Sequence, residues 1–263
     1  KKKKKMMKQS GILFTGKKIF LVLLLLSSSV FAGQINVAVA ANVSYAMDKL
    51  IIEFNKTNPN TKIQVTLGSS GKLVAQIKNG APYNIFMAAN MGFPQSLYDD
   101  QIAITKPVVY AQGALAMISS KELDFSKGID IIKESSIEKI AIANPKTAPY
   151  GAATMEAIKN AGLEEVTKGK FVYAESASST VNYATTAADI GFIPKSSLFD
   201  ENLAQYKENK NWISVDTKLY KAIEQGIVII NNAKDNMEVK AFYDFILSAK
   251  AKKIFIDYGY IVE

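Results

Sequence analysis

The chain of 263 residues contains no cysteine, no histidine and no arginine. Without cysteine it can form no disulfide, and it offers no thiol to which a lipid anchor could be attached. Without histidine it lacks the commonest metal ligand in proteins and the usual base of a catalytic triad. These absences argue against a disulfide-stabilised scaffold, most metal centres and most hydrolases, although a Ser–Lys catalytic arrangement stays open.

The excess of positive charge is confined to the start of the chain. The formal net charge is +8, from 32 basic and 24 acidic residues. Residues 1–32 contain eight lysines and no acidic residue, so the rest of the chain is neutral overall. Proteins that bind nucleic acids present a basic face. We therefore expect no nucleic-acid partner.

Residues 1–32 also have the three parts of a secretory signal peptide. A basic segment extends to Lys18, an apolar run covers Ile19–Leu26, and Val30-Phe31-Ala32 offers a cleavage site before Gly33. The apolar run is too short to span a bilayer as a helix. We therefore expect a signal peptide at residues 1–32 and a protein that is soluble in a bacterial periplasm, without a lipid anchor.

After residue 32 the sequence alternates between strand-like and helical patterns. Alternating or β-branched segments predict strands at residues 34–40, 62–67, 85–88, 108–119, 139–143, 171–174, 189–193 and 222–230. Helical spacing follows most of these segments, and capping-box patterns at Ser135–Glu138 and Asp235–Glu238 predict two further helix starts. This order predicts an α/β fold with mostly parallel sheets.

Two long strand-like runs, residues 108–119 and 222–230, lie between two such α/β sets. We therefore predict two lobes joined by two crossing strands. Residues 33–110 with 228–263 would form lobe 1, and residues 111–227 would form lobe 2. Open α/β sheets bind ligands at the carboxyl ends of their strands, so a ligand cleft is expected between the lobes.

Four strand-to-helix junctions consist of small or capping residues, namely Ala41-Asn42, Gly68–Gly71, Ala148–Gly151 and Ser176–Ser179. A helix N-terminus has backbone N–H groups without an intrahelical acceptor and about half a positive charge. Each junction alone is more often an ordinary turn or cap. Because all four occupy the same place in the pattern, they could together hold a dianion by neutral hydrogen bonds.

Taken together, these motifs resemble those of the periplasmic molybdate-binding proteins of molybdate ABC transporters. The matching segments extend over essentially the whole chain after Ile35, and they are Val39–Met47, Gly68–Gly71, Gln76–Pro82, Ile85–Ala89, Asn144-Pro145, Pro149–Gly151, Ala187–Phe192 and Val239–Ile246. The resemblance implies a type II, two-lobed binding-protein fold that closes on molybdate or tungstate and delivers it to an inner-membrane permease. It further implies a monomer without enzymatic activity or cofactor, with molybdenum present only in the bound oxyanion and without a direct protein ligand.

The resemblance also implies which residues contact the anion. By position these are Asn42, Ser70 through its hydroxyl and backbone N–H, Tyr150 and Ala177 through backbone N–H groups, and Ala41 as a weaker candidate. Many family members have a tyrosine hydroxyl at the position of Pro194, and proline has no donor. The missing hydrogen bond is then replaced by Tyr150 or Asn42, or the site works without it.

Other functions remain as alternatives. A binding protein for sulfate or phosphate would share the architecture, whereas a ferric-ion site would favour adjacent tyrosines, which this chain lacks. A serine hydrolase would need Lys72 as its base, because histidine is absent. In addition, Gly68–Gly71 lacks the spacing of a nucleophile elbow. A structural or adhesive surface protein would leave the four junctions unexplained.

Overall fold

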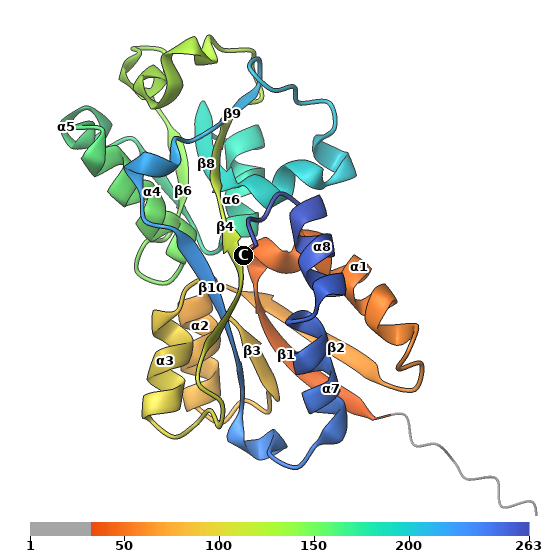
Figure 1. Cartoon of the computed structure of the whole chain (residues 1–263). Helices are drawn as coiled ribbons and strands as arrows, with labels where there is room; N and C mark the ends of the chain where they lie inside the picture. Colours follow the sequence, from red (N-terminus) through yellow and green to blue (C-terminus); the bar gives the residue numbers. More distant parts are fainter. Residues whose placement is uncertain (1–32, 263) are drawn as a thin grey trace, which may run out of the picture. The chain divides into compact units, whose positions relative to one another are not determined.

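The computed structural model describes residues 33–262, so the expected signal peptide at residues 1–32 lies outside the described residues. None of the helices within residues 33–262 combines the length and apolar character needed to cross a membrane. The strands of this part of the chain form two five-stranded sheets (Figure 1). The sheets with their flanking helices confirm the predicted two-sheet α/β fold.

The first sheet has the strand order β2-β1-β3-β10-β4. Its strands are β1 (Gln34–Ala40), β2 (Lys62–Gly68), β3 (Ile85–Met87), β4 (Val108–Gly113) and β10 (Ile223–Ile229). The first three are parallel, and β10 pairs antiparallel with both β3 and β4. Its helices are α1 (Ser44–Asn55), α2 (Ser70–Lys78), α3 (Gly92–Asp99), α7 (Met237–Ile246) and α8 (Ala249–Asp257).

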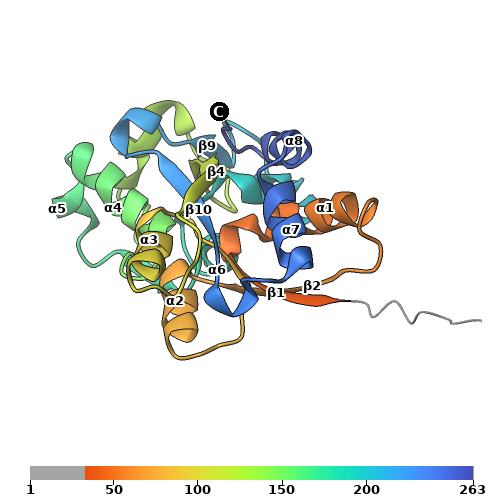
Figure 2. The same ribbon diagram turned by 60° about the horizontal axis from the view of Figure 1, so that its bottom comes forward.

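Alternate residues of β1 bury themselves on opposite faces of the first sheet, as the pleat of a strand requires. Ile35, Val37 and Val39 join the apolar cluster that contains the buried faces of α1, α7 and α8. Ala38 belongs instead to the cluster formed with α2 and α3. Helices therefore cover both faces of the first sheet, as Figure 2 shows.

The second sheet has the order β7-β6-β8-β5-β9, and its β7, β6 and β8 are parallel. Its strands are β5 (Leu115–Ile118), β6 (Ile140–Ala143), β7 (Phe171–Ala174), β8 (Ile190–Pro194) and β9 (Trp212–Ser214). Its α-helices are α4 (Pro149–Asn160), α5 (Glu164–Thr167) and α6 (Ala177–Thr186). The apolar side of α4 packs in a cluster with Leu115 and Ile142, whereas that of α6 packs in a cluster with Ala116 and Ala141.

The strand predicted at residues 108–119 is divided between the two sheets. It forms β4 up to Gly113 and β5 from Leu115, so the chain passes from the first sheet to the second at Ala114. The run predicted at residues 222–230 stays in the first sheet as β10. Hydrophobic alternation does not distinguish one long strand from two collinear strands with different partners, because both have the same period.

The helix start predicted at Ser135–Glu138 is wrong. A short 3-10 helix, η2 (Phe125–Lys133), precedes this segment, and β6 follows it at Ile140. The backbone N–H groups of Glu138 and Lys139 donate to Asp189 Oδ2, at 3.0 and 2.9 Å, instead of starting a helix. The start predicted at Asp235–Glu238 is correct within one residue, because Asn236 caps α7 through Glu238 and Val239.

Candidate functional site

The four predicted junctions meet around one buried cavity. Its lining comes from the ends of β1 and β2, from Ala89 after β3, and from the N-termini of α2, α4 and α6. The lining residues are Ala40, Ala41, Asn42, Gly68, Ser69, Ser70, Ala89, Ala148, Pro149, Tyr150 and Ala177. The structure therefore brings together every residue that the sequence nominated for the site, whereas Pro194 does not line the cavity.

The lining of this cavity contains no charged side chain. Ser70 and Ala177 are the first residues of α2 and α6, and Tyr150 is the second residue of α4. The N–H groups of the first helical turn have no acceptor within their own helix. Three helix N-termini therefore direct donors and partial positive charge at one space with an uncharged lining, which suits an anion.

The Ser70 side chain is oriented as a donor. Its Oγ accepts a hydrogen bond from the backbone N–H of Ala89 at 2.9 Å. Because this bond occupies a lone pair, the hydroxyl proton is left to point elsewhere, and both residues line the cavity. Ser70 can thus offer both its hydroxyl and its backbone N–H to one ligand.

The side chains of Asn42 and Tyr150 take part in a buried hydrogen-bond network with Gln225. Asn42 Nδ2 donates to Gln225 Oε1 at 2.8 Å, and Gln225 Nε2 donates to the Tyr150 hydroxyl at 3.3 Å. Asn42 Nδ2 also donates to the Tyr260 hydroxyl at 2.9 Å and lies 3.4 Å from the Tyr150 oxygen. Tyr110 donates to Gln225 Oε1 at 3.0 Å. The network joins η1 (Ala41–Val43), α4, the paired strands β4 and β10 of the first sheet, and Tyr260 near the C-terminus.

The network also fixes the backbone beside the cavity. The carbonyl oxygen of Asn42 accepts from the hydroxyls of Tyr260 at 2.8 Å and Ser196 at 3.0 Å. Gly113 lies against Tyr150, and a Cβ at this position would overlap the phenolic oxygen. Asn42 is thereby held between the first sheet, the second sheet and the C-terminal segment.

Burial keeps the phenols of this network neutral. Desolvation raises the pKa of Tyr260 to about 12. Among the described residues, no acid adds to this rise and no lysine opposes it. Desolvation likewise raises the pKa of Tyr110 and Tyr150 well above its ordinary value. The groups around the cavity therefore keep one protonation state through the neutral and mildly alkaline range.

Two contacts link the helix N-termini of the two sheets beside the cavity. The backbone N–H of Gly71 in α2 donates to the carbonyl of Thr147, before α4, at 2.9 Å. Lys72 and Glu175 form an ion pair at 3.3 Å, and each side chain is more than half exposed. The ion pair is too solvated to hold the two sides together, whereas the backbone bond requires their close approach.

Sequence reasoning missed Ser69 and the network residues Gln225, Tyr260 and Ser196. Gln225 is fully buried in β10, and a polar residue inside an otherwise apolar strand was the available signal. Ser69 lines the cavity, and its Oγ has no hydrogen-bond partner within residues 33–262. Asn42 Oδ1 is likewise without a partner in this part of the chain. As a hydrogen-bond acceptor, Oδ1 is suited to a water molecule and not to an oxyanion.

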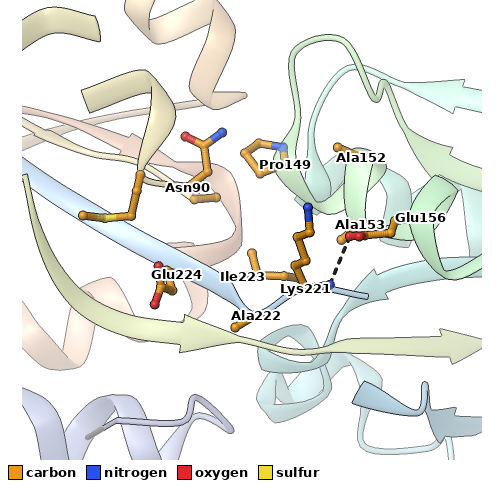
Figure 3. Close-up of a pocket in the computed structure, with 11 residues that line it drawn as sticks. Asn90, Pro149, Ala152, Ala153, Glu156, Lys221, Ala222, Ile223 and Glu224 are labelled. Atoms are coloured by element: carbon orange, nitrogen blue, oxygen red, sulfur yellow. Dashed lines mark hydrogen bonds between the residues drawn. The ribbon is translucent and has the colours of Figure 1, made fainter. Parts of the chain in front are cut away.

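A second hollow lies next to the cavity but is unsuited to an anion. This open hollow is lined by residues of α4, by Asn90 and by Lys221–Glu224 at the start of β10 (Figure 3). Glu156 and Glu224 contribute carboxylates to it, and the backbone N–H of Lys221 donates to Glu156 at 3.0 Å. Lys221 also lines the hollow, so its lining carries two carboxylates against one ammonium. This net negative charge disfavours an oxyanion, and the neutral cavity is the better candidate.

Comparison with known proteins places the chain among binding proteins. The model of the family described as bacterial extracellular solute-binding proteins matches residues 35–261. The molybdate-binding protein ModA of Azotobacter vinelandii is 32% identical over 90% of this chain and 93% of its own length. ModA of Rhodobacter capsulatus is 30% identical over 88% of this chain and 90% of its own length.

The solved structure of the Azotobacter vinelandii periplasmic molybdate-binding protein matches with a TM-score of 0.80 at 27% identity. The match covers 87% of this chain and 99% of that one. Sequence and fold thus match over nearly the whole described chain. The protein belongs to the family of bacterial extracellular solute-binding proteins.

Proposed function

We propose that this protein binds molybdate, and tungstate of nearly the same size, in the periplasm and delivers it to the permease of an ABC transporter. The observation that carries the proposal is the uncharged cavity at which three helix N-termini and η1 converge. Similarity to molybdate-binding proteins over most of the chain supports the choice of ligand. On this proposal the protein needs no cofactor, performs no catalysis and acts as a monomer.

The anion would be held by hydrogen bonds from neutral donors. Ser70 would donate through its hydroxyl and N–H, and Tyr150 and Ala177 through their backbone N–H groups. Asn42 would contribute its backbone N–H, because its side-chain amide already donates to Gln225 and Tyr260; Ala41 is the weaker neighbour. The Tyr150 hydroxyl accepts from Gln225 Nε2, which would orient the phenol at the start of α4, and its own proton would stay available as a further donor.

Ligand capture would close two lobes, residues 33–110 with 228–263 and residues 111–227. Both boundaries fall in β4 and β10, the paired strands beside which the two sheets meet. The bond from Gly71 to Thr147 joins the proposed lobes at the mouth of the cavity and would form only on closure. The permease would then recognise the closed form.

Size and protonation would decide which anion fits. Sulfate has shorter bonds than molybdate, so it would leave some buried donors unpaired, at a cost of about 1–3 kcal/mol each. Phosphate carries a proton near neutral pH, and this proton needs a hydrogen-bond acceptor. The N–H and O–H groups proposed to contact the anion act as donors instead. A rigid ring of donors would therefore favour molybdate and tungstate.

A thermal melt of the purified protein with molybdate, tungstate, sulfate and phosphate at equal concentrations tests the proposal. At one hundred times Kd a ligand adds about 2.7 kcal/mol to stability. For a chain of this size the Tm should then rise by roughly 5–10 °C. We expect that rise with molybdate and tungstate only; a rise with sulfate or phosphate alone would replace the proposed ligand.

A further inference from the structure

Ser69 is a cavity residue whose hydroxyl has no use in the protein alone. Its side chain is 4% exposed, it lines the cavity, and its Oγ lacks a hydrogen-bond partner within residues 33–262. Nearly all buried polar groups in proteins are hydrogen-bonded, so an unpartnered hydroxyl in a cavity calls for a ligand or water. The same hydroxyl lies at the entrance of α2, where partial positive charge favours an anion.

One usual local partner of this hydroxyl is taken by another group. Ser69 is the N-cap of α2, and an N-cap serine normally accepts a hydrogen bond from the second or third N–H of the helix. Here the second N–H, that of Gly71, donates to Thr147 at 2.9 Å, and the Ser69 side chain caps nothing. One of the two N–H groups that an N-cap serine could bond is therefore taken by Thr147, and the Ser69 hydroxyl makes no capping bond.

The other polar side chains of the cavity are already engaged. Ser70 Oγ accepts from Ala89, and the Asn42 amide nitrogen and the Tyr150 phenol are bound within the Gln225 network. The hydrogens of the Asn42 amide are therefore committed, whereas the Tyr150 hydroxyl only accepts in these bonds. Ser69 is the cavity hydroxyl that neither donates nor accepts a hydrogen bond among the described residues.

We infer that the Ser69 hydroxyl donates a hydrogen bond directly to the bound oxyanion and supplies the donor that Pro194 cannot provide. This inference rests on the proposed function of the cavity. Ser69 and Ser70 then hold the anion from adjacent positions at the start of α2. The buried Ser69 hydroxyl gains a hydrogen-bond partner only when the ligand is bound, so it stabilises the bound state.

Titration calorimetry with sodium molybdate on wild-type protein and Ser69→Ala tests the inference. A hydrogen bond to a charged ligand corresponds to about a 10- to 100-fold change in affinity, so Kd should rise by that factor. The melting temperature without ligand should stay the same or rise, because the variant removes a buried hydroxyl that bonds to nothing. Ser69→Gly, which also lacks the hydroxyl and is well tolerated at an N-cap, should weaken binding equally.

Ser248→Ala is the matched control. Ser248 is the N-cap of α8 and accepts from the N–H of Ala251 at 3.4 Å, away from the cavity. Its replacement should lower the melting temperature without ligand and leave the molybdate affinity unchanged. A folded Ser69→Ala protein with wild-type affinity would overturn the inference while leaving the proposed function intact. Failure of the wild-type protein to bind molybdate would instead overturn the proposed function, and the inference with it.

Discussion

Replacing Gly71 by alanine should weaken ligand binding through the contact between α2 and the segment before α4. A Cβ on Gly71 would lie 3.0 Å from Thr147 Cα, 3.1 Å from Thr147 O and 3.2 Å from Phe93 Cζ. The phenyl ring can turn away, but the two Thr147 atoms are backbone, so the helices would have to separate by a few tenths of an ångström. Overpacking of this kind costs about 1–3 kcal/mol.

If Gly71 approaches Thr147 only when the lobes close, that cost falls on the ligand-bound state alone. Kd for molybdate should then rise about 5- to 150-fold in a calorimetric titration. The melting temperature without ligand should change little, since an open form avoids the contact. Gly92→Ala is the matched control, because a Cβ on Gly92, also at a helix start, would meet open space.

The reasoning would be refuted by a folded Gly71→Ala protein that binds molybdate as tightly as wild type. A large loss of stability without ligand, with no loss of affinity, would also contradict it. That result would mean that the two helix starts stay in contact in every state. Gly71 would then serve packing and not closure.

Four further predictions concern the donors, the network and the surface charge. Ser70→Ala should raise Kd for molybdate about 10- to 100-fold, because it removes a hydroxyl donor. Equilibrium dialysis with molybdenum analysis measures this, and an unchanged Kd would show that the Ser70 hydroxyl does not bind the anion. Gln225→Met leaves several buried groups without partners and should lower the free energy of unfolding, measured in urea, by about 2–5 kcal/mol, whereas the neighbouring Glu224→Met should lower it little. Equal losses would mean that the network does not stabilise the fold. Lys72→Ala should change Kd less than about twofold, because its ion pair with Glu175 is largely exposed; a large loss would contradict binding by neutral donors. Because burial raises the pKa of Tyr260 to about 12, this phenol should lower stability by about 1.4 kcal/mol per pH unit between about pH 10 and 12. Tyr110 and Tyr150 also have raised pKa values, so Tyr260→Phe should reduce the slope in alkaline melts without abolishing it, and an unchanged slope would assign the effect to other groups.

The sign of the alkaline effect follows from the direction of the pKa shift. An unfolded tyrosine loses its proton near pH 10, whereas buried Tyr260 keeps its proton up to about pH 12. Between these values the unfolded chain binds fewer protons than the folded chain, so rising pH favours unfolding. At neutral pH the same group is protonated in both states and contributes no pH dependence.

The positions of the helix starts could be predicted from sequence because they depend on local residues. Small residues at Gly68–Gly71 and Ser176–Ser179 follow alternating strands, and both segments precede helices in the structure. Parallel strands then place these junctions at the same edge of their sheets. That is why the four junctions could be predicted to lie together from the pattern, whereas the contact residues Asn42, Ser70 and Tyr150 within them came from the family resemblance; all three line one cavity.

The hydrogen-bond network could not be predicted in the same way. Asn42 is separated by 183 residues from Gln225 and by 218 residues from Tyr260, and no periodicity relates such positions. The role of Ser69 was equally hidden, because a serine before a helix normally caps it. Only the structure shows that Thr147 takes the Gly71 donor and that the Ser69 hydroxyl makes no capping bond.

A crystal structure of the protein with bound molybdate, using the anomalous scattering of molybdenum, tests the central claim most directly. The account predicts one strong peak in the cavity between Ser69, Ser70, Tyr150 and Ala177, within hydrogen-bond reach of N–H and O–H groups only. A peak held by a lysine ammonium, or one in the hollow beside Glu156 and Glu224, would contradict it.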